Sequence, residues 1–155
     1  MTYDKKAKKI YDTMVSALNK ADWKFDERKS DLLIVSNYGN EDFQIDFLME
    51  VDAIREVVRL FAPLSFKVPA DKRLDAAVAA AVANYGMVNG SFDLDIKSGE
   101  LSFRLTTSYC GCEIGEKFFL GAISTAMSTV AAYYLRFLSL STGEIDLQRF
   151  IELEK

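Results

Sequence analysis

The sequence predicts an α+β fold in which helices flank a twisted antiparallel sheet. The first observation is a change of period along residues 84–104. Apolar residues recur at helical spacing up to Gly86, and apolar and polar residues alternate after it. The second observation is the order of the predicted elements, which is one helix, four strands, a helix, two strands and a long helix. Runs of strands separated by helices, without strict alternation, are typical of an antiparallel sheet.

Length and composition indicate one globular domain over residues 1–155. Half of the residues are hydrophobic and 27% are charged, which is ordinary for a folded protein with a sizeable core. With a net charge of -4, the protein lacks the excess of basic residues that is typical of nucleic-acid-binding proteins, so we expect no nucleic-acid partner. No signal peptide is recognisable at the N-terminus, so we expect a cytoplasmic protein.

An amphipathic helix is predicted over residues 3–20. Its apolar stripe consists of Tyr3, Ala7, Ile10, Tyr11, Met14 and Leu18. The same segment carries the only local basic run of the chain, which is Lys5, Lys6, Lys8 and Lys9. We interpret these lysines as a solvated helix face, and the alternative is a contact with an anionic surface.

The sequence after this helix predicts four strands, at residues 23–25, 32–36, 43–50 and 57–61. A turn at residues 29–31 separates the first two strands, and a loop at residues 38–40 follows the second. The fourth strand should end near Ala62, because Pro63 cannot donate a hydrogen bond to the ladder.

The third and fourth strands predict an apolar patch on the outer face of their hairpin. A loop at Ala53-Ile54 would keep Arg59 out of the core and place it opposite Leu48. Three apolar side chains then cluster on a face that should otherwise meet water, namely Leu48, Val57 and Phe61. We predict that this patch contacts a partner protein or a second copy of the chain, as in a homodimer. The alternative is that the chain's own terminal segment, residues 144–154, covers it.

A second helix is predicted over residues 70–85, ending at Gly86, where a left-handed residue commonly closes a helix. Its apolar stripe consists of Leu74, Ala77, Val78, Ala81, Val82 and Tyr85.

The alternating residues that follow predict a hairpin with a two-residue loop at Ser98-Gly99. This loop would set Phe92 opposite Leu105 and Asp93 opposite Arg104, so that apolar and charged residues pair on separate faces. Gly99 is expected to have a positive φ, which a side chain would penalise.

The C-terminal part predicts a loop at residues 108–115, a helix over 116–138 and a short terminal helix over 144–154. Residues 118–135 carry no charge and reach the lower limit for spanning a bilayer. Serines and threonines on one side and an apolar stripe on the other instead indicate a helix buried on one broad side, so we expect no membrane contact.

The titratable residues exclude several chemistries. The chain has no histidine, which removes imidazole as a general base and as a metal ligand. Cys110 and Cys112, which flank Gly111, cannot complete a zinc site within one chain. We interpret them as reduced loop thiols. The alternatives are a strained disulfide, half of an intersubunit site, or a redox switch.

Several short motifs resemble those of the YbjN-domain proteins, a bacterial family of which some members are labelled sensory-transduction regulators. The motifs are Phe66-Lys67-Val68-Pro69, Asp71-Lys72-Arg73, Asn84-Tyr85-Gly86, Gly90-Ser91-Phe92-Asp93-Leu94-Asp95 and Gly99-Glu100-Leu101-Ser102-Phe103-Arg104. The resemblance covers about Trp23 to Phe137. It implies the fold of class I type III secretion chaperones, often paired into a dimer, and it carries no settled catalytic residues.

The sequence therefore favours a non-catalytic regulatory or chaperone-like module that binds a protein and needs no cofactor. The alternative is a small-ligand or cation-binding protein that uses carboxylates on the polar sheet faces, namely Asp46, Asp93, Asp95 and Glu100. Asp93 and Asp95 could share a cation, but neutralisation of Asp93 by Arg104 is the simpler interpretation.

Overall fold

The antiparallel sheet predicted from the sequence is present in the computed structural model, which describes residues 4–39 and 41–154. Its strands are β1 (Asp26–Arg28), β2 (Leu33–Gly39), β3 (Gln44–Asp52), β4 (Val57–Lys67), β5 (Ser91–Leu94) and β6 (Glu100–Ser108). They lie in the order β1-β2-β3-β4-β6-β5, and every neighbouring pair is antiparallel. The α-helices of the described residues are α1 (Lys5–Lys20), α2 (Arg73–Tyr85), α3 (Glu116–Thr142) and α4 (Leu147–Glu152). The predicted α+β class is confirmed.

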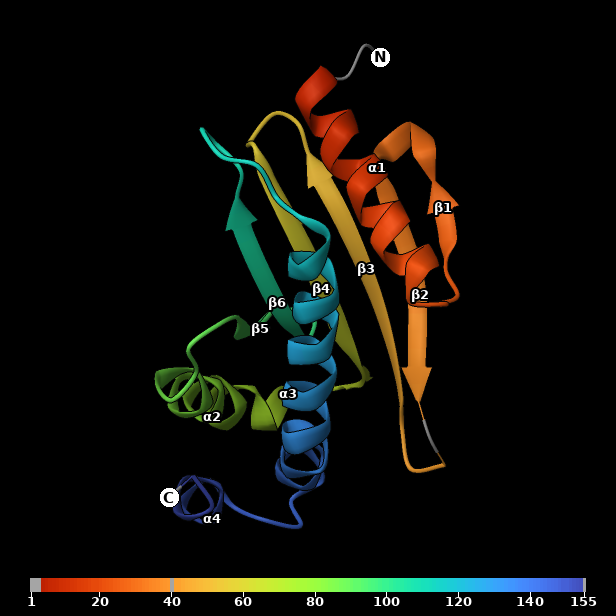
Figure 1. The fold of residues 1–155 in the computed structure, drawn as a ribbon. Coiled ribbons are helices and arrows are strands. Elements are labelled where there is room, and N and C mark those ends of the chain that lie inside the picture. The colour runs from red at the N-terminus through yellow and green to blue at the C-terminus, as the bar shows by residue number, and fades with distance from the viewer. Residues whose placement is uncertain (1–3, 40, 155) are drawn as a thin grey trace.

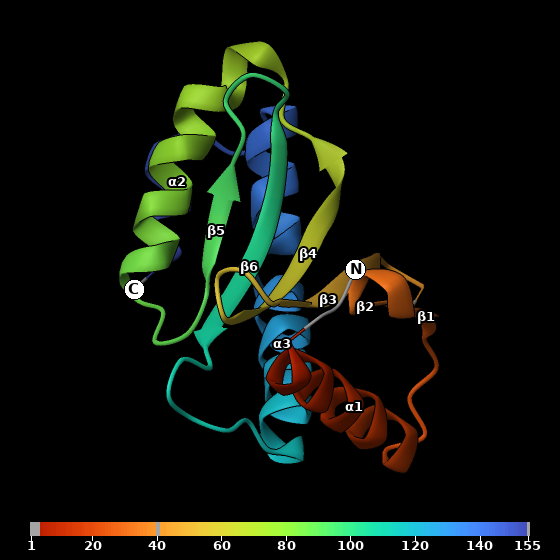
Figure 2. The same ribbon diagram turned by 90° about the horizontal axis from the view of Figure 1, so that it is seen from above.

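The helices cover one face of the sheet and one of its ends (Figure 1). α1 and α3 contact each other, and they pack on β3, β4 and β6. α2 runs alongside β5 at the end of the sheet, as Figure 2 shows, and α4 packs against α2 and α3. In the same view, no helix of the described residues lies over the other face of β4, β6 and β5. The hydrophobic core therefore lies on the helix side of the sheet.

The β3–β4 hairpin and the β5–β6 hairpin both differ from the prediction in strand register. Each has a four-residue loop where the sequence suggested two residues. Leu48 lies opposite Phe61, and Arg59 lies opposite Glu50. In the second hairpin Phe92 lies opposite Phe103. The shift is two residues in each case, so every side chain keeps its predicted face, and alternation alone could not reveal the difference.

An aspartate before each loop explains the longer turn. The Oδ1 atom of Asp52 accepts the backbone N–H groups of Ile54 and Arg55, both at 2.9 Å. Asp95 likewise accepts the N–H of Lys97 at 3.0 Å. These bonds stabilise a tight helical turn inside the loop. The last loop residue is left-handed in both hairpins, and Gly99 has the positive φ that the sequence predicted, +79°.

Two predictions about chain boundaries are wrong for identifiable reasons. β4 continues through Pro63 to Lys67. Beyond Phe61 it pairs with β6 alone, so its other edge has no partner strand. The missing N–H of Pro63 on that unpaired edge therefore removes no hydrogen bond between strands. The first strand lies at β1 and not at residues 23–25, because the backbone N–H of Trp23 donates to the C=O of Leu18 in α1 and not to a neighbouring strand. Gly86 ends α2 as expected, but with φ -87°, which is not left-handed.

The second helix packs through a different face from its apolar stripe. The buried residues of α2 are Ala76, Ala79, Ala80 and Ala83. Asn84 fixes this orientation, since its side-chain amide accepts the N–H of Phe92 at 2.7 Å and donates to its C=O at 3.0 Å. The amide thereby covers the free edge of β5. Small side chains allow this close approach, so the larger apolar residues of α2 face outward.

The longest helix, α3, is apolar enough by length and composition to cross a membrane. It extends to Thr142, four residues beyond the prediction, and Gly143 closes it in the left-handed conformation. Its buried stripe, which includes Phe119, Ala126 and Phe137, packs against β4, β6 and α1. The stripe therefore builds the core on one broad side of the helix, as the sequence pattern indicated.

Candidate functional site

An apolar groove is lined by residues that directly follow α1, by residues around the β2–β3 loop and by residues of α3. Its volume is about 660 Å³. One wall carries three aromatic rings, and the other carries apolar and small residues of α3. The lining residues are Ala21, Trp23, Tyr38, Phe43, Leu120, Ile123, Ser124, Met127, Ser128 and Ala131. We refer to this feature as the aromatic groove.

The first wall is rigid because Trp23 is held at several atoms. Its backbone N–H donates to the C=O of Leu18 at 2.9 Å, and its indole Nε1–H donates to the hydroxyl of Ser36 at 2.8 Å. The hydroxyl of Ser36 in turn donates to the C=O of Lys24 at 2.6 Å. The indole stacks on Tyr38 with ring centroids 6.2 Å apart. A fixed, amphipathic ring of this kind is a typical anchor in protein interfaces.

The part of the groove around Phe43 is also held in place by contacts within the chain. Phe43 stacks on Tyr134 of α3 with ring centroids 5.3 Å apart. The hydroxyl of Tyr134 shares a 2.6 Å hydrogen bond with Ser65 on β4. Tyr38 and Leu120, which both line the groove, are exposed to solvent. The groove therefore offers an ordered apolar surface that already meets water in the free protein.

Sequence reasoning missed this groove. Tyr38 was expected in a loop at residues 38–40, but Tyr38 and Gly39 belong to β2, and Asn40 lies outside the described residues. A signal was present, because three aromatic residues stand at the start of a predicted strand or in a predicted loop, namely Trp23, Tyr38 and Phe43. Their convergence with α3, about 100 residues later in the sequence, has no local signature.

The structure brings part of the predicted patch together. Leu48 and Phe61 lie directly opposite each other on β3 and β4, and Val57 lies opposite Asp52 at the start of β4. All three are half-buried, on the sheet face that α1 and α3 do not cover. The guanidinium of Arg59 lies over the ring of Phe61, 5.6 Å from its centroid. The alternative cover by the terminal segment is wrong, because α4 packs against α2 and α3.

We expect Phe61→Asp to remain folded, because the side chain is half-buried and faces away from the core. The circular dichroism spectrum should keep its native shape. If the patch joins two copies of the chain, light scattering will show the variant as a monomer. Unfolding of the variant would instead show that Phe61 belongs to the core.

The sheet-face carboxylates do not converge. Asp93 pairs with Arg104 and also accepts the hydroxyl of Ser91, so its predicted neutralisation is confirmed although the two residues are diagonal neighbours. The hydroxyl of Ser98 and the N–H of Lys97 hold the pKa of Asp95 below its usual value. No group of three or more metal-ligating side chains occurs within the described residues.

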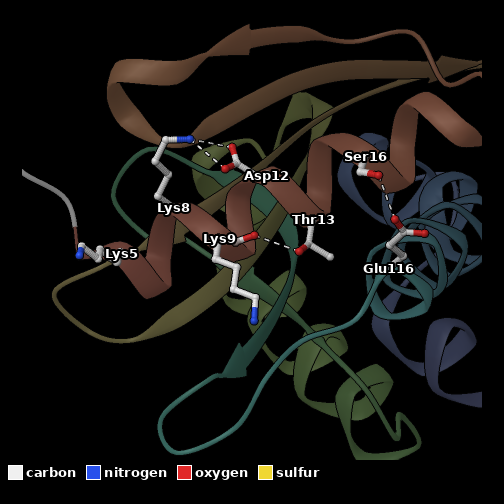
Figure 3. A pocket seen from close by; sticks show the side chains of 7 residues that line it. All are labelled: Lys5, Lys8, Lys9, Asp12, Thr13, Ser16 and Glu116. Atoms are coloured by element: carbon white, nitrogen blue, oxygen red, sulfur yellow. Dashed lines mark hydrogen bonds and ion pairs between the residues drawn. The ribbon is translucent and has the colours of Figure 1, made fainter.

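The N-terminal lysines line a shallow polar hollow on α1 (Figure 3). Lys8 pairs with Asp12 at 2.8 Å, and Lys9 pairs with Glu113 at 2.7 Å. Lys6 donates to the C=O of Tyr109 at 2.7 Å. Because most of these ammonium groups already have partners within the chain, the contacts support a solvated helix face over a surface for anions.

Both cysteines are free and exposed in the loop between β6 and α3. A hydrogen bond to Glu56, together with the charge of that residue, raises the pKa of the Cys110 thiol. The Sγ of Cys112 lies 3.6 Å from the C=O of Ser108. A raised pKa lowers the thiolate fraction at neutral pH, so Cys110 is a weak nucleophile in this state.

We expect the double variant Cys110→Ser, Cys112→Ser to fold with near-native stability, because neither side chain contributes to the core. Its thermal unfolding should lie within about 2 °C of the parent, in keeping with small effects at exposed positions. Loss of the cooperative transition, or a metal bound in stoichiometric amount by the parent, would contradict this interpretation of the loop.

Known structures share this fold. YbjN of E. coli, a candidate transcription regulator, superposes with a TM-score of 0.62 over 81% of this chain and 88% of its own, at 15% identity. A chain from the HopA1–SchA chaperone–effector complex superposes with a TM-score of 0.51 over 92% of this chain and 97% of its own, at 14% identity. No protein-family model matches the chain, and no curated protein matches it in sequence. The chain thus has the YbjN and type III secretion chaperone-like fold that the motifs implied.

Proposed function

We propose that this chain is a non-catalytic protein-binding module, regulatory or chaperone-like, which takes an apolar segment of a partner protein into the aromatic groove. The observation that carries the proposal is the groove itself, a preformed concave surface with three fixed aromatic rings. Aromatic anchors in desolvated pockets supply most of the free energy in protein interfaces.

The position of the groove supports a peptide segment as its occupant. Its lining begins at Ala21, directly after the last residue of α1, so the groove starts where this helix stops covering the sheet. An apolar segment placed there would continue that layer and bury Tyr38, Leu120 and the rings beside them. Ser124 and Ser128 would remain available to its backbone polar groups.

The comparisons agree with a binding role at the level of the fold. One of the similar structures is a complex between a chaperone and its effector protein. Fold similarity at this identity does not transfer a partner, so the partner class is inferred from the groove. As part of the same proposal, the chain acts as one cytoplasmic domain without a cofactor, and the patch of Leu48, Val57 and Phe61 is a secondary contact surface.

Trp23 makes the proposal directly testable, because it is the only tryptophan of the sequence and lies in the groove. Peptides selected from a random library on the immobilised protein should carry large apolar side chains. Their binding should change the emission of Trp23. Leu120→Glu, which places a charge in the groove, should weaken binding by about tenfold or more.

Leu135→Glu is the matched control, since Leu135 lies on the same helix, is exposed and does not line the groove. This variant should bind the selected peptides like the parent. Peptides that bind the parent and Leu120→Glu equally and leave the tryptophan emission unchanged would exclude the groove as the site. A selection that yields no binding peptide would also count against the proposal.

A further inference from the structure

The connection between α2 and β5 contains the one asparagine of the sequence that is followed by glycine, Asn89-Gly90. This short connection lies at the end of the sheet, beside the edge strand β5 (Figure 2). Asn89 is exposed, and the backbone N–H of Gly90 makes no hydrogen bond to another described residue. A side-chain amide and an unbonded backbone nitrogen therefore adjoin each other at the surface.

These two features are the requirements of succinimide formation at an asparagine. In that reaction the backbone nitrogen of the following residue attacks the side-chain amide carbon, and a five-membered ring closes. Glycine favours the attack, since it has no side chain that shields its nitrogen and its backbone rotates freely. Gly90 has φ +80°, so the fold itself requires glycine here and keeps the reactive pair of residues together.

We propose that Asn89 is a site of spontaneous covalent modification, which converts it into isoaspartate and aspartate in the folded protein. The nitrogen of Gly90 gives its proton to a base in the solvent and forms a bond to the Cγ atom of Asn89. The bond from Cγ to the amide nitrogen breaks, and ammonia leaves. Water then opens the ring at either of its carbonyl carbons. The net reaction consumes one water, releases one ammonia and adds one carboxylate to the chain.

The other described asparagines lack this combination. The side-chain amide of Asn84 is bonded to the backbone of β5 through both its oxygen and its nitrogen. Asn37 is exposed, but the next residue is Tyr38, whose side chain shields its nitrogen and whose backbone belongs to β2. Asn19 lies in the last turn of α1, where helical hydrogen bonds occupy the following N–H. The structure therefore singles out Asn89.

Isoaspartate at this position should disturb the start of β5. It routes the backbone through the former side chain and adds one carbon atom to the main chain before Gly90. Gly90 has no room on the side of the sheet, since a Cβ atom built on it would overlap the ring of Phe103 and lie 3.0 Å from the C=O oxygen of Arg104. Phe103 is fully buried and contacts Phe92 of β5. The longer backbone therefore strains the pairing of β5 with β6.

Mass spectrometry of the full chain, incubated at neutral and at mildly alkaline pH, tests the site. The peptide that contains residue 89 should gain about 1 Da with time. The gain should be faster at the higher pH, because the attacking nitrogen must lose a proton. Isoaspartate methyltransferase with a labelled methyl donor should label the incubated protein. An unchanged mass and the absence of label would overturn the proposal.

Asn89→Gln is the matched control, because its longer side chain does not close the five-membered ring. This variant should stay unlabelled, and labelling equal to that of the parent would place the reaction elsewhere and refute the site. Incubation in urea tests the contribution of the fold. Since Asn89 is exposed without any opening of the structure, the native rate should lie within about tenfold of the rate in urea. A far slower native rate would show that the fold protects Asn89 and would contradict the proposal.

Thermal unfolding separates the two products. Protein enriched in isoaspartate should melt at least about 3 °C below the parent, because its backbone is lengthened beside Phe103. Asn89→Asp adds the same charge without lengthening the backbone, so it should melt like the parent. An equal loss in both would assign the effect to charge and refute the proposed strain at β5.

Discussion

Gly99→Val should lower the melting temperature far more than Ser98→Ala. Gly99 has φ +79°, and a Cβ atom built on it would lie 2.2 Å from the C=O oxygen of Val68. That oxygen cannot retreat, because it accepts from the Nε of Arg73 at 3.1 Å. We expect a loss on the order of 3 kcal/mol or more, and hence a drop in melting temperature of about 10 °C.

Ser98 is the matched control at the neighbouring position. Its hydroxyl donates to Asp95 at 2.7 Å and accepts the N–H of Glu100 at 3.2 Å, and the loop containing them is largely open to solvent. Loss of these bonds should cost about 1 kcal/mol or less. Thermal unfolding followed by circular dichroism compares the two variants, and equal shifts would show that the loop is not built around Gly99.

The large effect expected at Gly99 follows from a cluster of backbone carbonyls around one side chain. The guanidinium of Arg73 donates to the C=O groups of Val68, Lys97 and Ser98. The N–H of Val68 also donates to the C=O of Gly99 at 2.8 Å. The end of β4, the start of α2 and the second hairpin loop therefore meet at one point, and a side chain at Gly99 disturbs all three.

Phe150→Ala should cost about 3–5 kcal/mol of unfolding free energy, a large part of the 5–15 kcal/mol typical of a domain. The ring of Phe150 is fully buried and lies 5.0 Å from the ring of Phe137. Glu154 adds to the docking of α4, with one oxygen 2.6 Å from Arg136 and the other 2.8 Å from the hydroxyl of Tyr133. Urea unfolding monitored by circular dichroism measures the loss.

Ile151→Ala on the same helix provides the comparison, because Ile151 is exposed. Its effect should stay below about 1 kcal/mol. If both variants lose the same free energy, α4 is not anchored through Phe150. The terminal helix would then be free to cover another surface, including the patch of Leu48, Val57 and Phe61.

The sequence by itself determined the elements, their order and most of the side-chain faces. Helical spacing from Ala7 to Leu18 predicted the buried side of α1, and alternation predicted which residues of β3, β4, β5 and β6 enter the core. These patterns are local, and burial of one face imposes them directly on neighbouring residues. The predicted fold class and the chaperone-like resemblance followed from the same signals.

Strand register was decided by hydrogen bonds within the hairpin loops, and the orientation of α2 was decided by tertiary structure. A two-residue shift leaves every side chain on its face, so only the bonds from Asp52 and Asp95 to their own loops select the four-residue turns. On α2, both the alanine face and the Leu74–Tyr85 face have helical spacing. The close approach to β5, bonded through Asn84, selects the alanine face and leaves the larger residues outside.

The aromatic groove depends on tertiary structure more than any other feature. Trp23, Tyr38 and Leu120 belong to three segments that are distant in the sequence, and none of them stands in a pattern that predicts a site. The groove exists because α1 ends at Lys20 while α3 and the β2–β3 hairpin extend beyond it. The different lengths of these elements create a concave surface only when the elements pack together. Local periodicity describes one element at a time, so it cannot predict the groove.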